Sequence, residues 1–247
     1  MINPLDLSGK HILITGASSG IGRACAIQAS KLGANVTLIA RREEMLQETV
    51  SLMENSDIHS YRVFDVSNTD EIEALVKEIV VSEGAFDGFV HAAGIGQGRM
   101  LKQTKPSYVK KMYDIHTFAF FEFTRCLSSR KNLNQGASLV GISSVGAVKG
   151  NVSQCAYGSA KAAMNSFIIP AAIELATRNI RINNVAFGMV KTEMYDEFLE
   201  FGGSDSVMNR QYMGVIDVES AANSVIFLLS DACKYITGTV LPVYGGY

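Results

Sequence analysis

The sequence predicts an α/β fold built on one doubly wound parallel sheet of about seven strands, with helices on both faces. Three observations support this prediction. Short runs of apolar and β-branched residues alternate with longer helical stretches along almost the entire chain. These strand-like runs are continuously apolar, which is typical of a sheet that is covered on both faces. A glycine-rich turn follows the first of them and opens the first helical stretch.

The elements are expected in alternation, beginning with a strand near residue 11. Helices of about ten residues or more between strands indicate parallel crossovers, because antiparallel neighbours need only a short hairpin. The sequence has no internal repeat and no low-complexity linker, so residues 1–247 are expected to form a single domain. Helices are expected at residues 21–32, 43–53, 69–82, 107–130, 155–177 and 218–229. Strands are expected at residues 11–15, 35–40, 58–64, 86–91, 137–142, 180–186 and 239–243.

The composition excludes several classes of protein. The chain has 247 residues, of which 47% are hydrophobic and 19% charged, a balance typical of a globular protein with a large core. The formal net charge is -2 and no basic stripe occurs, so neither nucleic acid nor a membrane surface is an expected partner. No apolar run approaches the ~20 residues of a membrane span, and the N-terminus lacks the features of a signal peptide. The protein is expected to be cytoplasmic.

The cysteines and histidines do not form a metal-binding pattern. No two cysteines have CxxC spacing, so core packing or a free thiol is the expected role of each. The histidines are equally dispersed, and no metal cofactor is expected. The cysteines are Cys25, Cys126, Cys155 and Cys233, and the histidines are His11, His59, His91 and His116.

Residues 188–214 depart from the alternating pattern. This segment is rich in Met, Tyr, Phe and Gly and lies between the sixth strand and the last helix. That position places it over the carboxyl ends of the strands, where the loops of α/β proteins carry function. We interpret it in two ways, as a mobile lid or as a surface helix with adaptable packing residues.

The glycine-rich turn has the properties of a phosphate-binding site. It reads TGASSGIG from Thr15 to Gly22 and joins the first strand and helix of a Rossmann-type βαβ unit. Glycines permit a tight turn, close approach to a pyrophosphate and close packing of helix on strand. Unpaired N–H groups at the helix N-terminus then attract the phosphates. The candidate cofactor-binding residues of this turn are Gly16, Ser18, Ser19, Gly20, Ile21 and Gly22.

The residues after the second strand indicate which dinucleotide binds. Where an NAD-binding protein has an Asp or Glu for the ribose hydroxyls, this sequence has Arg41 and Arg42. Arginine pairs bidentately with phosphate, so the expected cofactor is NADP(H), with Arg41 as the main contact to the 2′-phosphate and Arg42 as a further one. The alternative is that both arginines are solvated loop residues.

Tyr157 and Lys161 form the candidate catalytic pair. They are four residues apart in YGSAK, and on the helix expected there both side chains lie on one face. A free tyrosine has a pKa near ~10, and a nearby lysine ammonium lowers that value. The pair is suited to giving a proton to a carbonyl oxygen while a hydride reaches its carbon. YxxxK alone is common by chance, and an exposed helix face is then the simpler interpretation.

Together these motifs resemble the short-chain dehydrogenase/reductase family and, in length and architecture, its 3-oxoacyl-carrier-protein reductase branch. The turn has the family's TGxxxGxG spacing, and Ser144, at the end of the fifth strand, precedes Tyr157 by the family's interval of 13 residues. The resemblance covers residues 7–247. It implies NADP(H)-dependent reduction of a ketone to a secondary alcohol, with Tyr157 as general acid or base.

The resemblance also implies roles for individual residues. Ser144 would hold the substrate oxygen, and Lys161 would assist Tyr157 and bond the nicotinamide ribose. His116 would be the fourth catalytic residue, nine positions before Arg125. Beyond the turn and the two arginines, the implied cofactor contacts are Asp65, Val66, Ala92, Ala93, Gly94, Tyr157, Lys161, Gly188, Val190 and Thr192.

Three residues depart from the family's pattern. His91 replaces the first Asn of NNAG, Phe187 replaces the Pro of PGxxxT, and His116 replaces the catalytic Asn. Without the fixed φ of proline, the turn after Phe187 is expected to be looser. His116 is interpreted in two ways: it relays protons near its unperturbed pKa of ~6.5, or it only shapes the helix.

The substrate is expected to be one of two kinds. One is a 3-oxoacyl thioester, either free or bound to a carrier, and the other is the ketone of a sugar or polyketide. The apolar residues of 188–214 favour an apolar or amphipathic substrate. An acidic carrier would need a basic patch near the site. The candidates for that patch are Arg125, Arg130, Lys131 and Arg178.

Two further alternatives concern the kind of protein and its assembly. The alternative to an enzyme is a catalytically weak regulator that binds NADP(H). A homotetramer or homodimer is expected, through the apolar helix faces of residues 108–123 and 162–175.

Overall fold

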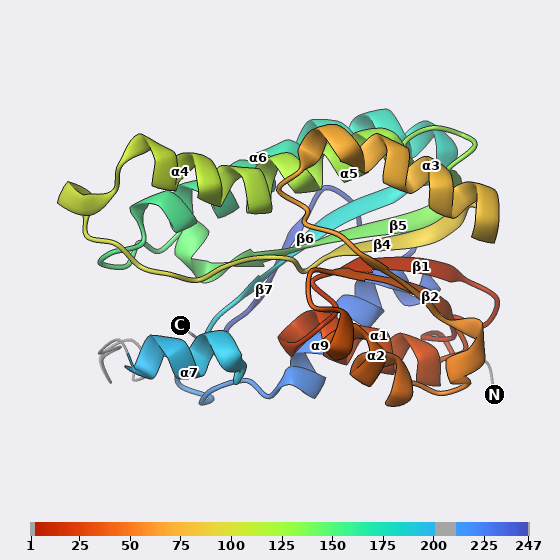
Figure 1. The fold of residues 1–247 in the computed structure, drawn as a ribbon, viewed down its shortest axis with the longest axis horizontal. Coiled ribbons are helices and arrows are strands. Elements are labelled where there is room, and N and C mark those ends of the chain that lie inside the picture. The colour runs from red at the N-terminus through yellow and green to blue at the C-terminus, as the bar shows by residue number, and fades with distance from the viewer. Residues whose placement is uncertain (1–2, 201–210, 247) are drawn as a thin grey trace.

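The structure, a computed structural model, describes residues 3–200 and 211–246, and the strands found there form one parallel sheet (Figure 1). Their order is β3-β2-β1-β4-β5-β6-β7, which confirms the predicted doubly wound fold. The strands are β1 (His11–Thr15), β2 (Asn35–Ala40), β3 (Ser60–Val63), β4 (Phe86–His91), β5 (Leu133–Ser144), β6 (Arg181–Phe187) and β7 (Val240–Val243).

Helices cover both faces of this sheet. Figure 1 shows α1, α2 and α9 on one face and α3 to α6 on the other. Within the described residues, no helix combines the length and the apolar character that crossing a bilayer requires. The helices are α1 (Gly20–Lys31), α2 (Glu43–Ser51), α3 (Ile72–Glu83), α4 (Pro106–Tyr113), α5 (Ala119–Leu127), α6 (Cys155–Leu175), α7 (Glu193–Glu200) and α9 (Val218–Leu229).

The two helical layers divide the side chains of each strand between them. In β1, Ile12 and Ile14 belong to the core cluster that includes α1 and α9, whereas Leu13 belongs to the cluster on the opposite face. Successive side chains of a strand point to opposite faces, and in β1 every one is buried. This double burial is the reason that the centre of the strand, residues 12–14, is continuously apolar.

The predicted boundaries agree with the structure for three strands and one helix. Residues 11–15, 35–40, 86–91 and 218–229 form the expected elements with the expected bounds. The helix predicted over 107–130 is divided, because a π-helical turn at Asp114–Phe118 separates α4 from α5.

The chain leaves β1 in two directions. It first adds β2 and β3 on one side and then returns to add β4 to β7 on the other. The loops after β1 and β4 therefore diverge at the carboxyl edge of the sheet, which is where ligands bind in such folds. Thr15 and His91, the last residues of these two strands, are register partners at that edge.

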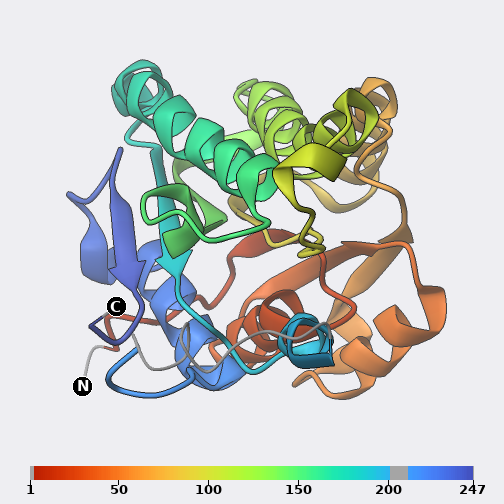
Figure 2. The ribbon, with the colours of Figure 1, turned by 90° about the vertical axis from the view of Figure 1, so that its left-hand side faces the viewer.

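The segment of residues 188–214 extends from this edge. Val190 pairs with Ile216, and α7 follows, on the same side of the sheet as α1 (Figures 1 and 2). Residues 201–210 of the segment lie outside the described residues. A mobile lid stays a prediction for the segment, and its described part contains a helix.

Candidate active site

The turn after β1 is so closely packed that it requires glycine. Gly16 has a φ of +70°, and a Cβ at this position would lie 2.6 Å from the backbone nitrogen of Ala93. A Cβ on Gly22 would collide with the carbonyl oxygen of Gly16. The side chain of Ser19, the N-cap of α1, makes no capping hydrogen bond. The first N–H groups of α1 thus suit an acceptor from outside, such as a pyrophosphate oxygen.

The two arginines after β2 flank this turn but have different partners. The Nη2 of Arg42 donates to the hydroxyl oxygens of Ser19 (3.0 Å) and Ser18 (3.4 Å). Arg41 lies 3.7 Å from the carboxylate of Asp65. Burial raises the pKa of Asp65, but hydrogen bonds and the charge of Arg41 together hold it below its usual range. The positive charge predicted for the 2′-phosphate is therefore present at this edge, and Arg42 is the arginine in contact with the turn.

His91 joins the end of β4 to its neighbours. Its Nδ1 accepts from the Thr15 hydroxyl (3.0 Å), and its Nε2 donates to the carbonyl oxygen of Ile115 in the π-helical turn (3.1 Å). Burial lowers the pKa of His91 to about 3, so the ring is neutral and one tautomer satisfies both contacts. The N–H groups of Ala92 and Ala93 also donate to Thr15. The histidine at this position has a structural role.

Ser144, Tyr157 and Lys161 come together at the carboxyl end of β5. The Ser144 hydroxyl accepts from the N–H of Gly146 (3.1 Å) and is hydrogen-bonded to the Tyr157 side chain. Tyr157 and Lys161 project from the first turns of α6. The Nζ of Lys161 lies 5.8 Å from the centre of the Tyr157 ring and donates to the carbonyl oxygen of Ile142 (2.6 Å). The spacing predicted from the sequence thus places three functional groups in one small region.

Burial controls the ionisation of the pair. It lowers the pKa of Lys161, which is 4% exposed, to about 7. It raises the pKa of Tyr157, and the hydrogen bond with Ser144 opposes this effect without outweighing it. The expected lowering of the tyrosine pKa is therefore wrong for the chain by itself. The reason is that Tyr157 is buried, and that Lys161, whose own pKa burial lowers, directs its Nζ to the carbonyl oxygen of Ile142.

His116 lies in the π-helical turn beside Tyr157. The two rings meet edge to face, with centroids 5.3 Å apart. The Nε2 of His116 donates to the carbonyl oxygen of Ile95 (3.0 Å), and the ring packs on Gly94, where a Cβ would lie 2.5 Å from its Cε1. Burial lowers the pKa of His116 well below its usual value, and the nearby Lys161 lowers it further. A neutral ring that supports the loop after β4 favours the helix-shaping interpretation over the proton relay.

The turn after β6 is firmly held although it lacks proline. Phe187 is buried and pairs with Val243 of β7, and the N–H of Gly188 donates to the Val243 carbonyl (3.0 Å). The side chain of Gln211, 3% exposed, accepts from the N–H of Met189 (2.7 Å) and donates to its carbonyl (3.1 Å). The expected loosening is therefore wrong, because strand pairing and Gln211 replace the restraint of a proline.

The chain after this turn returns to the phosphate-binding turn. The Thr192 hydroxyl donates to the carbonyl of Val190 (3.3 Å), and its methyl group would lie 3.3 Å from a Cβ on Gly20. The structure thus brings both ends of the predicted cofactor site together. Gln211 and Glu193, which pairs with Arg42, were missed in the sequence, because their partners lie 22 and 151 residues away and no motif marks them.

Arg178, one of the basic residues predicted for carrier docking, does not lie near Ser144. Arg178 donates to the carbonyl of Leu133, the first residue of β5, whereas Ser144 is the last. The full length of this 12-residue strand separates the two positions. The expectation that Arg178 contributes to a basic patch near the site is therefore wrong within one chain. For Arg125, Arg130 and Lys131 the expectation stays a prediction.

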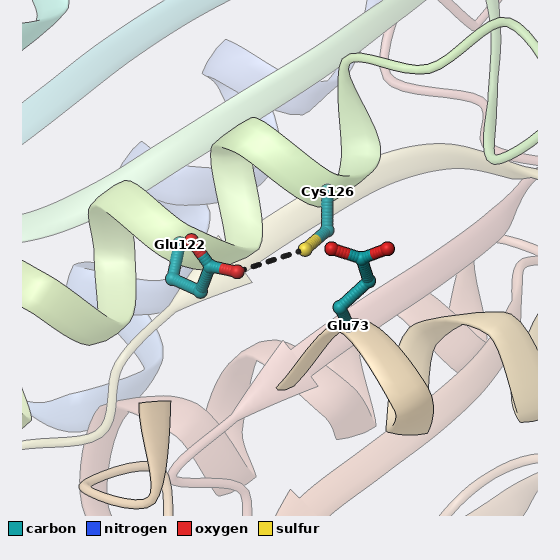
Figure 3. A group of neighbouring side chains, drawn as sticks. All are labelled: Glu73, Glu122 and Cys126. Carbon is teal, nitrogen blue, oxygen red and sulfur yellow. Dashed lines mark hydrogen bonds between the residues drawn. The ribbon is translucent and has the colours of Figure 1, made fainter. Parts of the chain in front are cut away.

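One group of potential metal ligands occurs in the described part of the chain, between α3 and α5: Glu73, Glu122 and Cys126 (Figure 3). The Nη2 of Arg125 donates to both carboxylates at 2.6 Å and already supplies a positive charge. Burial raises the pKa of Cys126 to about 12, so the sulfur is a thiol, which is a poor ligand. We interpret the group as a salt-bridge cluster.

Comparison with known proteins places this geometry in context. Residues 16–247 match the model of a family described as Enoyl-(Acyl carrier protein) reductase. The chain is 34% identical over 243 residues to the 3-oxoacyl-[acyl-carrier-protein] reductase FabG of Rickettsia bellii, covering 98% of each chain. It is 32% identical over 245 residues to the protein of the same name from Thermotoga maritima, covering 98% of this chain and 99% of the relative.

Solved structures agree over nearly the whole chain. A dehydrogenase/reductase from Sinorhizobium meliloti superposes with a TM-score of 0.90 at 27% identity, covering 98% of this chain and 96% of that one. The NADP-bound structure of ElxO superposes with a TM-score of 0.85 at 28% identity, covering 96% of this chain and 98% of that one.

Proposed function

Since the chain belongs to the short-chain dehydrogenase/reductase family and is an oxidoreductase acting on carbonyl or alcohol groups, we propose that it reduces the ketone of a 3-oxoacyl thioester to a secondary alcohol with NADPH. The observation that carries this proposal is the meeting of Ser144, Tyr157 and Lys161 at the same edge of the sheet as the phosphate-binding turn. We further propose that one domain carries both the cofactor and the substrate site.

The residues at this edge fit NADP(H). A turn without room for side chains and with uncapped N–H groups suits the pyrophosphate, and the guanidiniums of Arg41 and Arg42 suit the 2′-phosphate. When bound, the nicotinamide supplies or accepts a hydride. The NADP bound to ElxO supports the same choice of cofactor here. The residues proposed to contact the cofactor are those predicted from the sequence.

Tyr157 is the proposed proton donor. Because burial raises its pKa, the phenol is protonated at neutral pH, and this is the form that gives a proton to a carbonyl oxygen. The Ser144 hydroxyl, already bonded to this phenol, would hold the same substrate oxygen and stabilise charge that develops on it. Lys161, with a pKa of about 7, exchanges protons readily at neutral pH and is the group proposed to return a proton toward Tyr157.

His116 is proposed as a positioning residue. Its bond to Ile95 holds the loop after β4, and its edge-to-face contact restricts the Tyr157 ring. Its lowered pKa keeps the ring neutral, so it contributes no proton at neutral pH.

The substrate class rests on the relatives and on the rim of the site. The relatives are named as reductases of a 3-oxoacyl group on an acyl carrier protein. The loops after β4 and β5 expose large apolar side chains, which suit an acyl chain better than a sugar. These side chains are Met100, Leu101, Val148 and Val152.

We also propose a cytoplasmic homotetramer or homodimer. Exposed apolar side chains lie together on α6 and at the start of α5, where the rings of Phe121 and Phe167 are 4.7 Å apart. This surface has the character of a helix-packed interface between copies of the chain.

Replacement of Tyr157 by Phe tests the proposed chemistry. The variant lacks the donated proton but keeps the shape of the site, so kcat for a 3-oxoacyl thioester should fall at least ~100-fold, with the Kd for NADPH within about threefold. NADPH oxidation measures the first quantity and nucleotide fluorescence the second. Tyr235→Phe, at a residue that is 92% exposed, is the matched control. Near-native kcat in Tyr157→Phe would contradict the assigned role.

The same assay distinguishes an enzyme from the alternative, an NADP(H)-binding regulator. The regulator alternative predicts NADPH binding without turnover of 3-oxoacyl thioesters, sugar ketones or polyketide ketones. Wild-type turnover of the thioester above background, lost in Tyr157→Phe, would exclude it.

A further inference from the structure

We propose that Glu193 couples recognition of the cofactor's 2′-phosphate to the position of α7, and so acts as a residue that sets cofactor preference. In the chain by itself Glu193 holds Arg42. A 2′-phosphate takes over that arginine and releases Glu193. The inference rests on the proposed use of NADP(H).

Three oxygen acceptors meet at one nitrogen atom of Arg42. The Nη2 of Arg42 donates to the hydroxyls of Ser19 (3.0 Å) and Ser18 (3.4 Å) and to the Glu193 carboxylate (3.3 Å). Two of these partners belong to the phosphate-binding turn, and the third is the first residue of α7. Arg42 therefore connects the adenosine end of the site to α7.

A 2′-phosphate and the Glu193 carboxylate compete for Arg42 through their negative charges. A sugar phosphate monoester carries about −1.5 to −2 charges at pH 7 and has three acceptor oxygens, and a guanidinium pairs with it bidentately. A single carboxylate oxygen gives Arg42 less negative charge and fewer acceptor positions than a phosphate does. Once phosphate has replaced it, the Glu193 carboxylate faces a group of like charge, and repulsion favours its displacement. NADH has no 2′-phosphate and leaves the pair between Arg42 and Glu193 intact.

Residues at the start of α7 contact several parts of the site. Thr192, just before Glu193, packs against Gly20 of the phosphate-binding turn. Met194, just after it, lies against Gly96 in the loop after β4, where a Cβ would be 2.5 Å from its Sδ. Three successive residues thus touch three different parts of the site. A displacement at Glu193 therefore changes contacts on the substrate side as well.

The size of the effect follows from exposure. The Arg42 and Glu193 side chains are 50% and 57% exposed, and ion pairs so open to water contribute little to folding stability. The pair therefore affects the difference in affinity between NADPH and NADH and contributes little to the stability of the fold. A preference change of ~3- to 10-fold is the expected scale.

Titration of NADPH and NADH into wild type and Glu193→Gln tests the coupling, with nucleotide fluorescence as the readout. Loss of the competing carboxylate should lower the Kd for NADPH ~3- to 10-fold and change the Kd for NADH less than twofold. Glu197→Gln is the matched control, since it removes the same charge from an exposed acid one turn later in α7. It should alter neither Kd more than about twofold.

Hydrogen exchange tests the structural part without turnover. Adenosine 2′,5′-bisphosphate carries the phosphate of interest and no nicotinamide, and AMP lacks that phosphate. In wild type the bisphosphate should raise amide exchange in residues 193–196, whereas AMP should not. In Glu193→Gln the two probes should act alike.

The outcomes separate this inference from the proposed function. If wild type binds NADPH no better than NADH, the NADP(H) assignment and the coupling both fail. If wild type prefers NADPH but Glu193→Gln leaves or lowers that preference, or if the bisphosphate leaves α7 unchanged, the coupling alone is overturned.

Discussion

Burial of ionisable side chains is the dominant physical feature of the site at the scale of single residues. Lys161, His91 and His116 lie within one small region, and burial lowers the pKa of each. Three neighbouring basic groups cannot all be charged there without large cost. The result is a site with two neutral imidazoles and one lysine that titrates close to neutral pH.

The pKa of Lys161 makes the stability of the fold depend on pH. Its folded value of about 7 lies below the unfolded value of ~10.4, so between these values the unfolded chain binds more protons and stability rises with pH. Lys161→Met removes this dependence. Urea unfolding should therefore show that the free energy of unfolding of the variant exceeds that of wild type by more at pH 6 than at pH 9.

Lys131→Met, at an exposed lysine, is the control for that experiment and should show the same difference at both pH values. If Lys161→Met differs from wild type by the same free energy of unfolding at pH 6 and pH 9, burial does not shift the pKa of this lysine.

His116→Asn distinguishes the two interpretations of the histidine. A neutral positioning residue adds no ionisation to catalysis, so the variant should keep the wild-type shape of the kcat/KM profile between pH 5.5 and 8 and stay within ~5-fold of its activity. A proton relay predicts a wild-type limb near ~6.5 that the variant lacks. Steady-state kinetics over this pH range gives the answer.

At the scale of elements, long-range polar contacts hold the ends of helices and strands. Arg181 of β6 is buried, and its guanidinium donates to the carbonyl oxygens of Leu228 (2.6 Å), Leu229 (3.3 Å) and Ser230 (2.9 Å) at the end of α9. The Leu228 carbonyl also accepts from the Ser138 hydroxyl (2.7 Å), so the arginine and this serine together cap the C-terminus of the helix.

Arg181→Met should therefore destabilise the protein by roughly 1–3 kcal/mol, because the Leu229 carbonyl loses the guanidinium while those of Leu228 and Ser230 keep contacts with Ser138 and Cys233. Urea unfolding at pH 7 measures the change, with Arg130→Met at an exposed arginine as the control. A loss below about 1 kcal/mol would show that water replaces the guanidinium easily.

The division of the helix predicted over 107–130 also belongs to this scale. The periodicity of its residues is helical throughout, and nothing local marks a change at Asp114–Phe118. The π-helical turn is instead joined to other elements, through His91 to Ile115 and through His116 to Ile95. Such turns occur frequently at functional sites, where a neighbouring element compensates the altered backbone.

At the scale of the whole molecule, large apolar side chains of α5, of α6 and of the turn before α5 are exposed. They are Phe118, Phe121, Ile169 and Ile173, which are between 48% and 73% exposed. Light scattering at micromolar concentration should give two or four times the chain mass of 26.7 kDa. Ile169→Glu should shift the protein toward monomer, because it places a charge in the contact.

Val81→Glu, at an exposed apolar residue on α3, is the control for that experiment and should leave the mass unchanged. A wild-type monomer, or an Ile169→Glu variant with wild-type mass, would contradict an interface through α5 and α6.

The sequence by itself determined the fold class, most element positions and the motif residues, because these depend on local signals. Apolar runs define buried strands, glycines are required where Cβ atoms would collide at Gly16, and a spacing of four places Tyr157 and Lys161 on one helix face. Only the tertiary structure decided the ionisation of that pair, the firmness of the turn after Phe187, the distance of Arg178 from Ser144 and the contact of Arg42 with Glu193. The physical reason is that burial, desolvation and charge pairing depend on which distant residues become neighbours, and local sequence patterns carry no information about that.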